Sequence, residues 1–167
     1  PTREFARTQL GSRFGKTEAW VIVGTSTSDP HVYLGFSRDV AAGELEDWFE
    51  RQDHDVILQA MNRLPVSAGD TVYVPAGTPH SIGAGLFLVE LQEPTDFSVM
   101  LEWQDFGLDE CRHGQLGMTP QQSLACFKRG WVTPQQVALV HRHDRPAQAG
   151  ISSLLPESAA PFFQAQE

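Results

Sequence analysis

Basic residues, cysteines and long apolar runs are all scarce in this sequence. Its 167 residues hold 12 lysines and arginines against 21 aspartates and glutamates, which gives a formal net charge of -9. Such a field repels phosphate backbones and anionic lipids, so neither nucleic acid nor a membrane is an expected partner. No apolar run approaches the roughly 18 residues that a membrane-spanning helix needs. The hydrophobic content of 41% is ordinary for a globular chain with a substantial core.

The two cysteines, Cys111 and Cys126, bear on the cellular compartment. Two thiols in a chain of this size are typical of a reducing environment, although one disulfide is also compatible with the count. No signal-peptide pattern opens the sequence. The chain starts at Pro1 rather than Met and ends in "PFFQAQE", which indicates a piece of a longer protein. We expect a cytoplasmic protein and leave its oligomeric state open.

The first hundred residues are rich in strand signals. Segments of β-branched and aromatic residues separated by turn residues predict short strands, and the cluster "TSTSDP" predicts a hairpin between the first two. Apolar residues at helical spacing predict two short helices between the second and third strands. The predicted strands are 19–24, 31–37, 70–74, 79–82, 86–91 and 97–103, and the predicted helices are 42–52 and 55–64.

The character of the chain changes after Trp103. Residues 106–117 resemble a loop, and "TPQQ" opens two predicted helices, over 119–130 and 133–143. In each, a threonine precedes a proline at the first helical position, and a glutamine stands three residues after the threonine. We therefore divide the chain into a β domain with short helices at 42–64 (residues 1–105), a loop and helical segment (106–149) and a linker into a second, truncated domain (150–167).

The stretch "GDTVYVPAGTPH" (69–80) is the first that carries chemistry. A glycine turn admits a strand, and then Pro75 and Gly77 bend the chain just before His80. A histidine held by restricted backbone suits metal ligation, where geometry must be fixed closely. A second stretch, "GKTEAW" (15–20), places Lys16 two residues before Glu18 at the start of a predicted strand. Carboxylate and imidazole together are suitable zinc ligands.

These two stretches, followed by "GAG" and "ELQEPTD", resemble the type I mannose-6-phosphate isomerases of the cupin superfamily. The resemblance covers residues 1 to about 105 and implies an all-β fold, a cupin barrel of the jelly-roll type with helical additions. It also implies one Zn²⁺ per chain, with Glu18 and His80 as two of its ligands. The family's other two ligands, a glutamine and a histidine, precede a proline that Pro1 matches, so we expect them immediately before Pro1.

The resemblance further implies a reaction. The family interconverts an aldose phosphate and a ketose phosphate, so the expected partner is a sugar phosphate. Lys16 would line the site and supply positive charge, and Glu90, on a following strand, is a candidate acid or base, although a plain cross-strand polar role is equally compatible with its position. Asp96, with Thr95 before it, matches a serine–aspartate pair of the family.

One departure from the family pattern is at Met100. An arginine regarded as catalytic is expected there, and methionine offers neither charge nor donors. His113, Lys128 and Arg129, in the segment that follows, are candidates to supply the missing cation. Two hypotheses result: a metal-dependent aldose–ketose isomerase of carbohydrate metabolism, acting on mannose 6-phosphate or a related sugar, or a sugar-binding homologue with weakened or lost catalysis.

Overall fold

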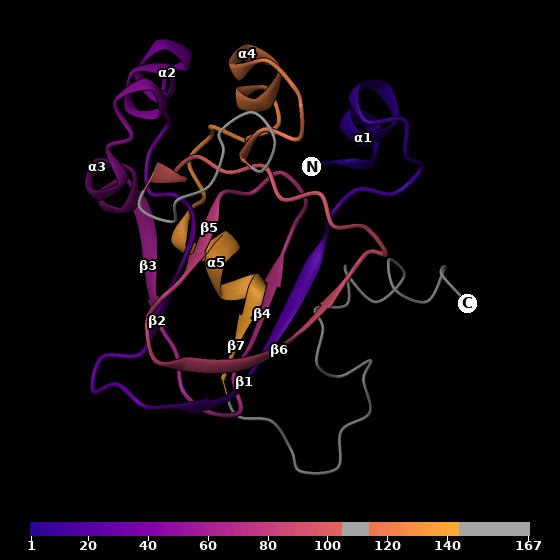
Figure 1. Ribbon diagram of the computed structural model, residues 1–167. Helices are drawn as coiled ribbons and strands as arrows, with labels where there is room; N and C mark the ends of the chain where they lie inside the picture. Colours follow the sequence, from indigo (N-terminus) through magenta and orange to yellow (C-terminus); the bar gives the residue numbers. More distant parts are fainter. Residues whose placement is uncertain (105–113, 144–167) are drawn as a thin grey trace.

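A computed structural model describes residues 1–104 and 114–143 of the chain. Its strands form two antiparallel sheets that face each other (Figure 1). The four-stranded sheet has the order β6-β1-β4-β7, and the three-stranded sheet has the order β3-β2-β5. In chain order the strands are β1 (Glu18–Thr25), β2 (His31–Phe36), β3 (Met61–Pro65), β4 (Thr71–Val74), β5 (His80–Ile82), β6 (Leu86–Gln92) and β7 (His141–Arg142).

The main core lies between the two sheets. Alternate residues of a strand face the same side, so Trp20 and Ile22 of β1 pack against Val32 and Leu34 of β2 from the opposite sheet. Each of these side chains is at most 1% exposed. Glu18, two residues before Trp20, faces the same side of β1 and therefore borders this core.

Two predicted features of the strand region are wrong. The first two strands do not form a hairpin, because β1 pairs with β4 and β6 while β2 pairs with β3 and β5. The turn cluster between them carries the chain from one sheet to the other, so that both strands bury an apolar face in the shared core. Residues 97–103 contain no strand.

Most of the helices lie at one end of the sheets, and α2, α4 and α1 are spread across the top of Figure 1. A second apolar cluster packs α2 and α3 against Phe36 at the end of β2. It includes Leu45 and Trp48 of α2 and Ile57 of α3. Within the described residues, every helix is too short or too polar to cross a bilayer. The helices are α1 (Arg3–Gln9), α2 (Ala42–Arg51), α3 (His54–Gln59), α4 (Pro120–Leu124) and α5 (Pro134–Val140).

Both "TPQQ" helix starts are confirmed. Thr119 and Thr133 cap α4 and α5, and each forms a capping box with the glutamine three residues later. Three helix ends differ from the prediction. The helix predicted over 55–64 stops at Gln59 and gives way to β3. α4 ends at Leu124 rather than at residue 130, and α5 ends at Val140, where β7 follows.

The described residues thus form antiparallel sheets with helical additions, as predicted, and β7 of the later segment joins the larger sheet through β4. The strand pairing does not close the two sheets into a barrel over these residues. Of the predicted domains, residues 150–167 lie outside the described residues, and the boundary at residue 105 stays a prediction.

Glu93 ties the N-terminal segment to the end of β6. Its fully buried carboxylate accepts hydrogen bonds from Arg3 Nε (2.6 Å) and from the backbone N–H of Thr17 (3.0 Å). Burial raises the pKa of Glu93, but the hydrogen bonds from Arg3 and Thr17 outweigh it and hold the pKa below its ordinary value of 4.5. The ionised carboxylate therefore stabilises the fold above pH 4.5, and this contribution is lost as the pH falls through the depressed pKa.

Glu93→Gln is expected to lower the free energy of unfolding at pH 7 by about 2 kcal/mol, because a charge-assisted acceptor becomes a neutral one. Urea denaturation at pH 7 and at pH 3 measures this. The difference between wild type and variant should shrink at the lower pH. An exposed glutamate, Glu50, supplies the control Glu50→Gln, and a Glu93→Gln effect that is as small as the control's, or that persists unchanged at pH 3, would contradict this role.

Candidate active site

A tight turn delivers His80 to the edge of the core. The Thr78 N–H donates to Pro75 O (3.0 Å), and Gly77 between them has a φ of +80°, as the third residue of a type II turn requires. A Cβ at Gly77 would also meet Cys126 O at 3.0 Å. The proline and glycine of this motif therefore fix the bend from β4 toward β5, and His80 is the first residue of β5.

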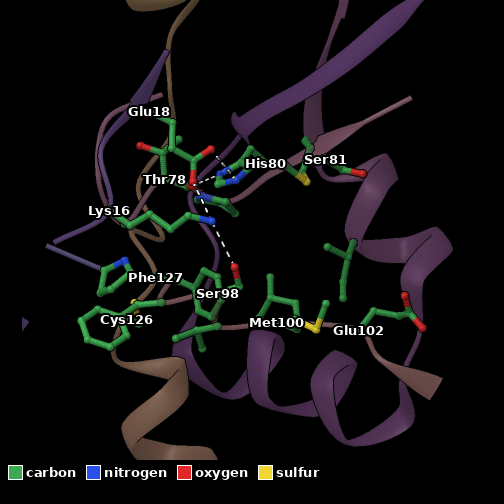
Figure 2. Close-up of a pocket in the computed structure, with 18 of the residues that line it drawn as sticks. Lys16, Glu18, Thr78, His80, Ser81, Ser98, Met100, Glu102, Cys126 and Phe127 are labelled. Carbon is green, nitrogen blue, oxygen red and sulfur yellow. Dashed lines mark hydrogen bonds and ion pairs between the residues drawn. The ribbon is translucent and has the colours of Figure 1, made fainter. Parts of the chain in front are cut away.

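The hydrogen bonding of His80 fixes which ring nitrogen is free. Its Nδ1 lies 2.8 Å from Thr78 O, and because a carbonyl oxygen only accepts, Nδ1 must carry the proton. In the neutral imidazole, Nε2 then holds a lone pair. This nitrogen lies 3.6 Å from Glu18 Oε2 (Figure 2). A ring oriented by a carbonyl on one nitrogen, with the other facing a carboxylate, is the arrangement found in metal-binding histidines.

Glu18 is a buried carboxylate, 1% exposed, at the start of β1. The indole N–H of Trp20 donates to its Oε2 (3.2 Å). Its Oε1 lies 3.1 Å from Lys16 Nζ as an ion pair, but it has no hydrogen-bond partner among the described residues. A buried carboxylate charge is costly unless it is paired, so Glu18 is suited to contact cations. The sequence-predicted pair Glu18 and His80 is thus brought together with its lone pairs facing one region.

Lys16 lies beside this pair with its side chain 15% exposed. Its Nζ donates to Ser98 Oγ (3.0 Å) and contacts the Glu18 carboxylate, so it is held between two partners (Figure 2). Ser98 was not singled out from the sequence, because it lies in a segment without regular structure. Its hydroxyl aims the ammonium group into the space in front of Glu18 and His80.

These side chains line a cavity of about 540 Å³, within the range of small-molecule sites. Met100 lines it too, and Pro1 contributes to the wall. Among the described residues that line it, Lys16 is the only lysine or arginine. The other titratable side chains among the described lining residues are Glu18, His54, His80, Glu102 and Cys126.

Glu90 lies outside the wall of this cavity but next to Glu18. The same Trp20 indole N–H that contacts Glu18 also donates to Glu90 Oε2 (3.0 Å). Burial and the charge of Glu18 raise the pKa of Glu90. The two carboxylates therefore share one donor on neighbouring strands, and Glu90 is more easily protonated than an ordinary glutamate.

Three other residues considered from the sequence, Thr95, Lys128 and Arg129, do not line the cavity. Thr95 Oγ1 donates to Gly15 O, which fixes the segment after β6. Arg129 donates to Val40 O, and the Lys128 side chain does not line the cavity. His113 and Cys111 lie outside the described residues. Cys126 is free and buried, and it lines the cavity.

Sequence reasoning missed a second cluster of candidate metal ligands. Asp70, His141 and His143 come together although 71 residues separate the first two. The signal available in the sequence was "HRH" (141–143), two histidines spaced as neighbours on one face of a strand, which we interpreted only as a helix end.

No family model matches this chain. It is similar to curated proteins nonetheless. It is 34% identical over 101 residues to the mannose-6-phosphate isomerase ManA of Bacillus subtilis, a match that covers 60% of this chain and 30% of ManA. It is also 34% identical over 82 residues to the mannose-6-phosphate isomerase of Streptococcus mutans, which covers 49% of this chain and 24% of that protein. The matched region therefore spans less than a third of either relative.

A solved structure shows the same fold. The crystal structure of the mannose 6-phosphate isomerase from Bacillus subtilis aligns with 91% of this chain and 44% of its own, at a TM-score of 0.62 and 19% identity. Relatives in sequence and in fold thus carry the same name, and they confirm the resemblance to the mannose-6-phosphate isomerase family that the motifs indicated.

Proposed function

We propose that this relative of the mannose-6-phosphate isomerases takes part in a metal-dependent aldose–ketose isomerisation of a hexose phosphate, of the mannose 6-phosphate to fructose 6-phosphate type. One observation carries the proposal. Lys16, Glu18 and His80 converge on one cavity, where His80 Nε2 lies 3.6 Å from one carboxylate oxygen of Glu18 and Lys16 Nζ lies 3.1 Å from the other.

Glu18 and His80 would hold the metal, for which we propose zinc. Their donor set of one carboxylate oxygen and one imidazole nitrogen fits it, and the carbonyl of Thr78 keeps the imidazole in the required tautomer. Two ligands are too few for a stable site, and the family resemblance assigns the other two to the residues before Pro1. The position of Pro1 in the cavity wall supports this assignment.

The chemistry required is the movement of one proton from C2 to C1 and of another from the C2 hydroxyl to the C1 oxygen. The bound metal would polarise the two sugar oxygens. Lys16 places a cation where negative charge develops on those oxygens, and Ser98 holds it there. Glu90, with its raised pKa, is the candidate to accept and return a proton, assisted by the Trp20 indole that orients it.

Charge explains why a metal is needed for this substrate. Without it, the positive charge of Lys16 is balanced by Glu18, and Lys16 is the only lysine or arginine among the described lining residues. A sugar phosphate would then meet no net attraction. We further infer that the two facing sheets correspond to a jelly-roll cupin barrel.

Met100 favours a second candidate, a sugar-binding homologue with weak catalysis or an isomerase of another sugar. It lines the cavity at the place where the family resemblance expects a cation. An apolar side chain there removes a donor to negative charge on the substrate.

The proposed function is tested by measuring conversion of mannose 6-phosphate to fructose 6-phosphate by the zinc-loaded full-length protein. Lys16→Met is expected to lower kcat/KM by about 10- to 100-fold, the value of one charged hydrogen bond. The exposed Lys128 gives the matched control Lys128→Met, which removes the same charge outside the cavity and should leave kcat/KM unchanged. Absence of turnover for phosphorylated aldoses in the loaded wild type would contradict the proposal.

A further inference from the structure

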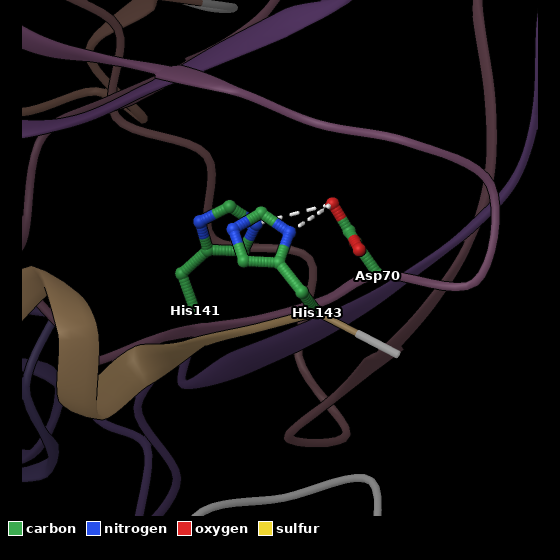
Figure 3. A group of neighbouring side chains, drawn as sticks. All are labelled: Asp70, His141 and His143. Carbon is green, nitrogen blue, oxygen red and sulfur yellow. Dashed lines mark hydrogen bonds and ion pairs between the residues drawn. The ribbon is translucent and has the colours of Figure 1, made fainter. Parts of the chain in front are cut away.

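Two histidines and a buried aspartate meet at the end of β4 away from the candidate active site. Asp70 directly precedes β4, and His141 and His143 come from β7 and the residue after it (Figure 3). His141 Nε2 lies 3.3 Å from Asp70 Oδ2, and His143 Nδ1 lies 3.1 Å from the same oxygen. Both imidazoles therefore point at one carboxylate oxygen.

This cluster is separate from the site around Glu18. In the register between β1 and β4, Glu18 lies opposite Val74, whereas Asp70 stands four residues earlier along the chain. At the rise of a β-strand this separation is about 13 Å. One metal ion cannot contact both groups, so any cation at Asp70 is distinct from the one proposed for Glu18 and His80.

The spacing of the three groups matches a metal site. For zinc bonds to nitrogen and oxygen of roughly 2.0 to 2.2 Å, the edges of a ligand tetrahedron measure about 3.3 to 3.6 Å. The two measured edges, 3.3 and 3.1 Å, are close to this range. One ligand atom from each of the three residues lies within 4.8 Å of the others. A cation could enter with small side-chain movements.

Backbone contacts orient the side chains of this cluster. The Ser67 N–H donates to Asp70 Oδ2 (2.8 Å), which orients the carboxylate, and the Asp70 and His141 side chains are 4% and 8% exposed. His141 pairs with Val72 of β4, and His143 follows two residues later on the same side of the chain. His143 is 66% exposed, so the group has two buried ligands and one at the surface that leaves an entry path.

We propose that Asp70, His141 and His143 bind a second divalent cation, zinc, which fastens β7 to β4. β7 is only two residues long and contacts β4 through two residue pairs, so few backbone hydrogen bonds hold it. A metal shared by both strands would supply the missing cross-link, with water in the fourth position, because the described part of the chain adds no fourth such ligand. This inference does not depend on the proposed isomerase activity.

The test uses a His80→Ala background, in which the proposed catalytic zinc site is lost. The chelator-treated, metal-free protein is titrated with ZnCl₂ in a calorimeter, and Co²⁺ loading is followed by visible absorption for tetrahedral coordination. One zinc per chain is expected. Loss of an outer-shell partner already costs roughly 10- to 100-fold in metal affinity, so adding His143→Ala should weaken zinc binding at least about 100-fold.

The control is His31→Ala in the same background, because His31 is also an imidazole beside a carboxylate, that of Asp29, but lies in the other sheet. It should leave zinc binding unchanged. Since His143 is at the surface, its variant should fold, and circular dichroism checks this. Hydrogen exchange should show zinc slowing the amides of β7. Unchanged zinc affinity in the His143→Ala variant, or no zinc binding in the background protein, would overturn the proposal. The three side chains would then only hydrogen-bond β7 to β4.

Discussion

His80→Ala is expected to remove the catalytic zinc and to lower kcat/KM for mannose 6-phosphate by roughly 10³-fold or more, because a bound metal contributes several kcal/mol of transition-state charge stabilisation. The lost imidazole is the one whose Nε2 faces Glu18 and whose Nδ1 is fixed by Thr78. Elemental analysis of the full-length protein, combined with the isomerase assay, measures both effects. Glu18→Gln should behave in the same way, because it removes the anionic ligand.

The second proposed site makes the metal count informative. Zinc content should fall from two per chain to one in His80→Ala and in Glu18→Gln, and it should stay at two in the control His31→Ala. An isomerase that keeps its activity and its full zinc content without His80 would show that the cavity around Glu18 is not the metal centre.

Met100→Arg is expected to raise kcat/KM for mannose 6-phosphate by about 10²-fold, the usual value of one donor that stabilises negative charge in a transition state. Met100 lines the cavity whose only described lysine or arginine is Lys16, so a guanidinium there would double the positive charge available to a phosphate or an enediolate. Steady-state kinetics with mannose 6-phosphate and with unphosphorylated mannose measure the effect. Met100→Leu keeps the wall apolar and is the matched control.

The sign of the change separates the two candidate functions. A chain adapted to another sugar should lose activity toward its true substrate when the arginine is introduced. Burying the guanidinium costs desolvation free energy, and a substrate without a matching negative charge does not offset that cost. Ordinary turnover of mannose 6-phosphate by the wild type, together with indifference to Met100→Arg, would show that this position does not face the reacting groups.

Local motifs predicted the parts of this site that depend on local backbone. Pro75 and Gly77 restrict the chain just before His80, so a fixed histidine could be expected from the sequence, and the turn has the predicted sharp bend. The helix starts at Thr119 and Thr133 were equally predictable, because a capping box is formed by residues three apart. The resemblance to the family rested on the same short motifs.

Pairing between distant segments was not predictable in this way. The turn cluster after β1 has the composition of a hairpin turn, yet it crosses between sheets, because only a sandwich buries the apolar faces of both strands. The sequence by itself determined the turn that carries His80 and the motif that carries Glu18. Only the tertiary structure decided that Glu90 shares the Trp20 indole with Glu18, and that His141 and His143 meet Asp70, since strand register is set by a core to which every strand contributes.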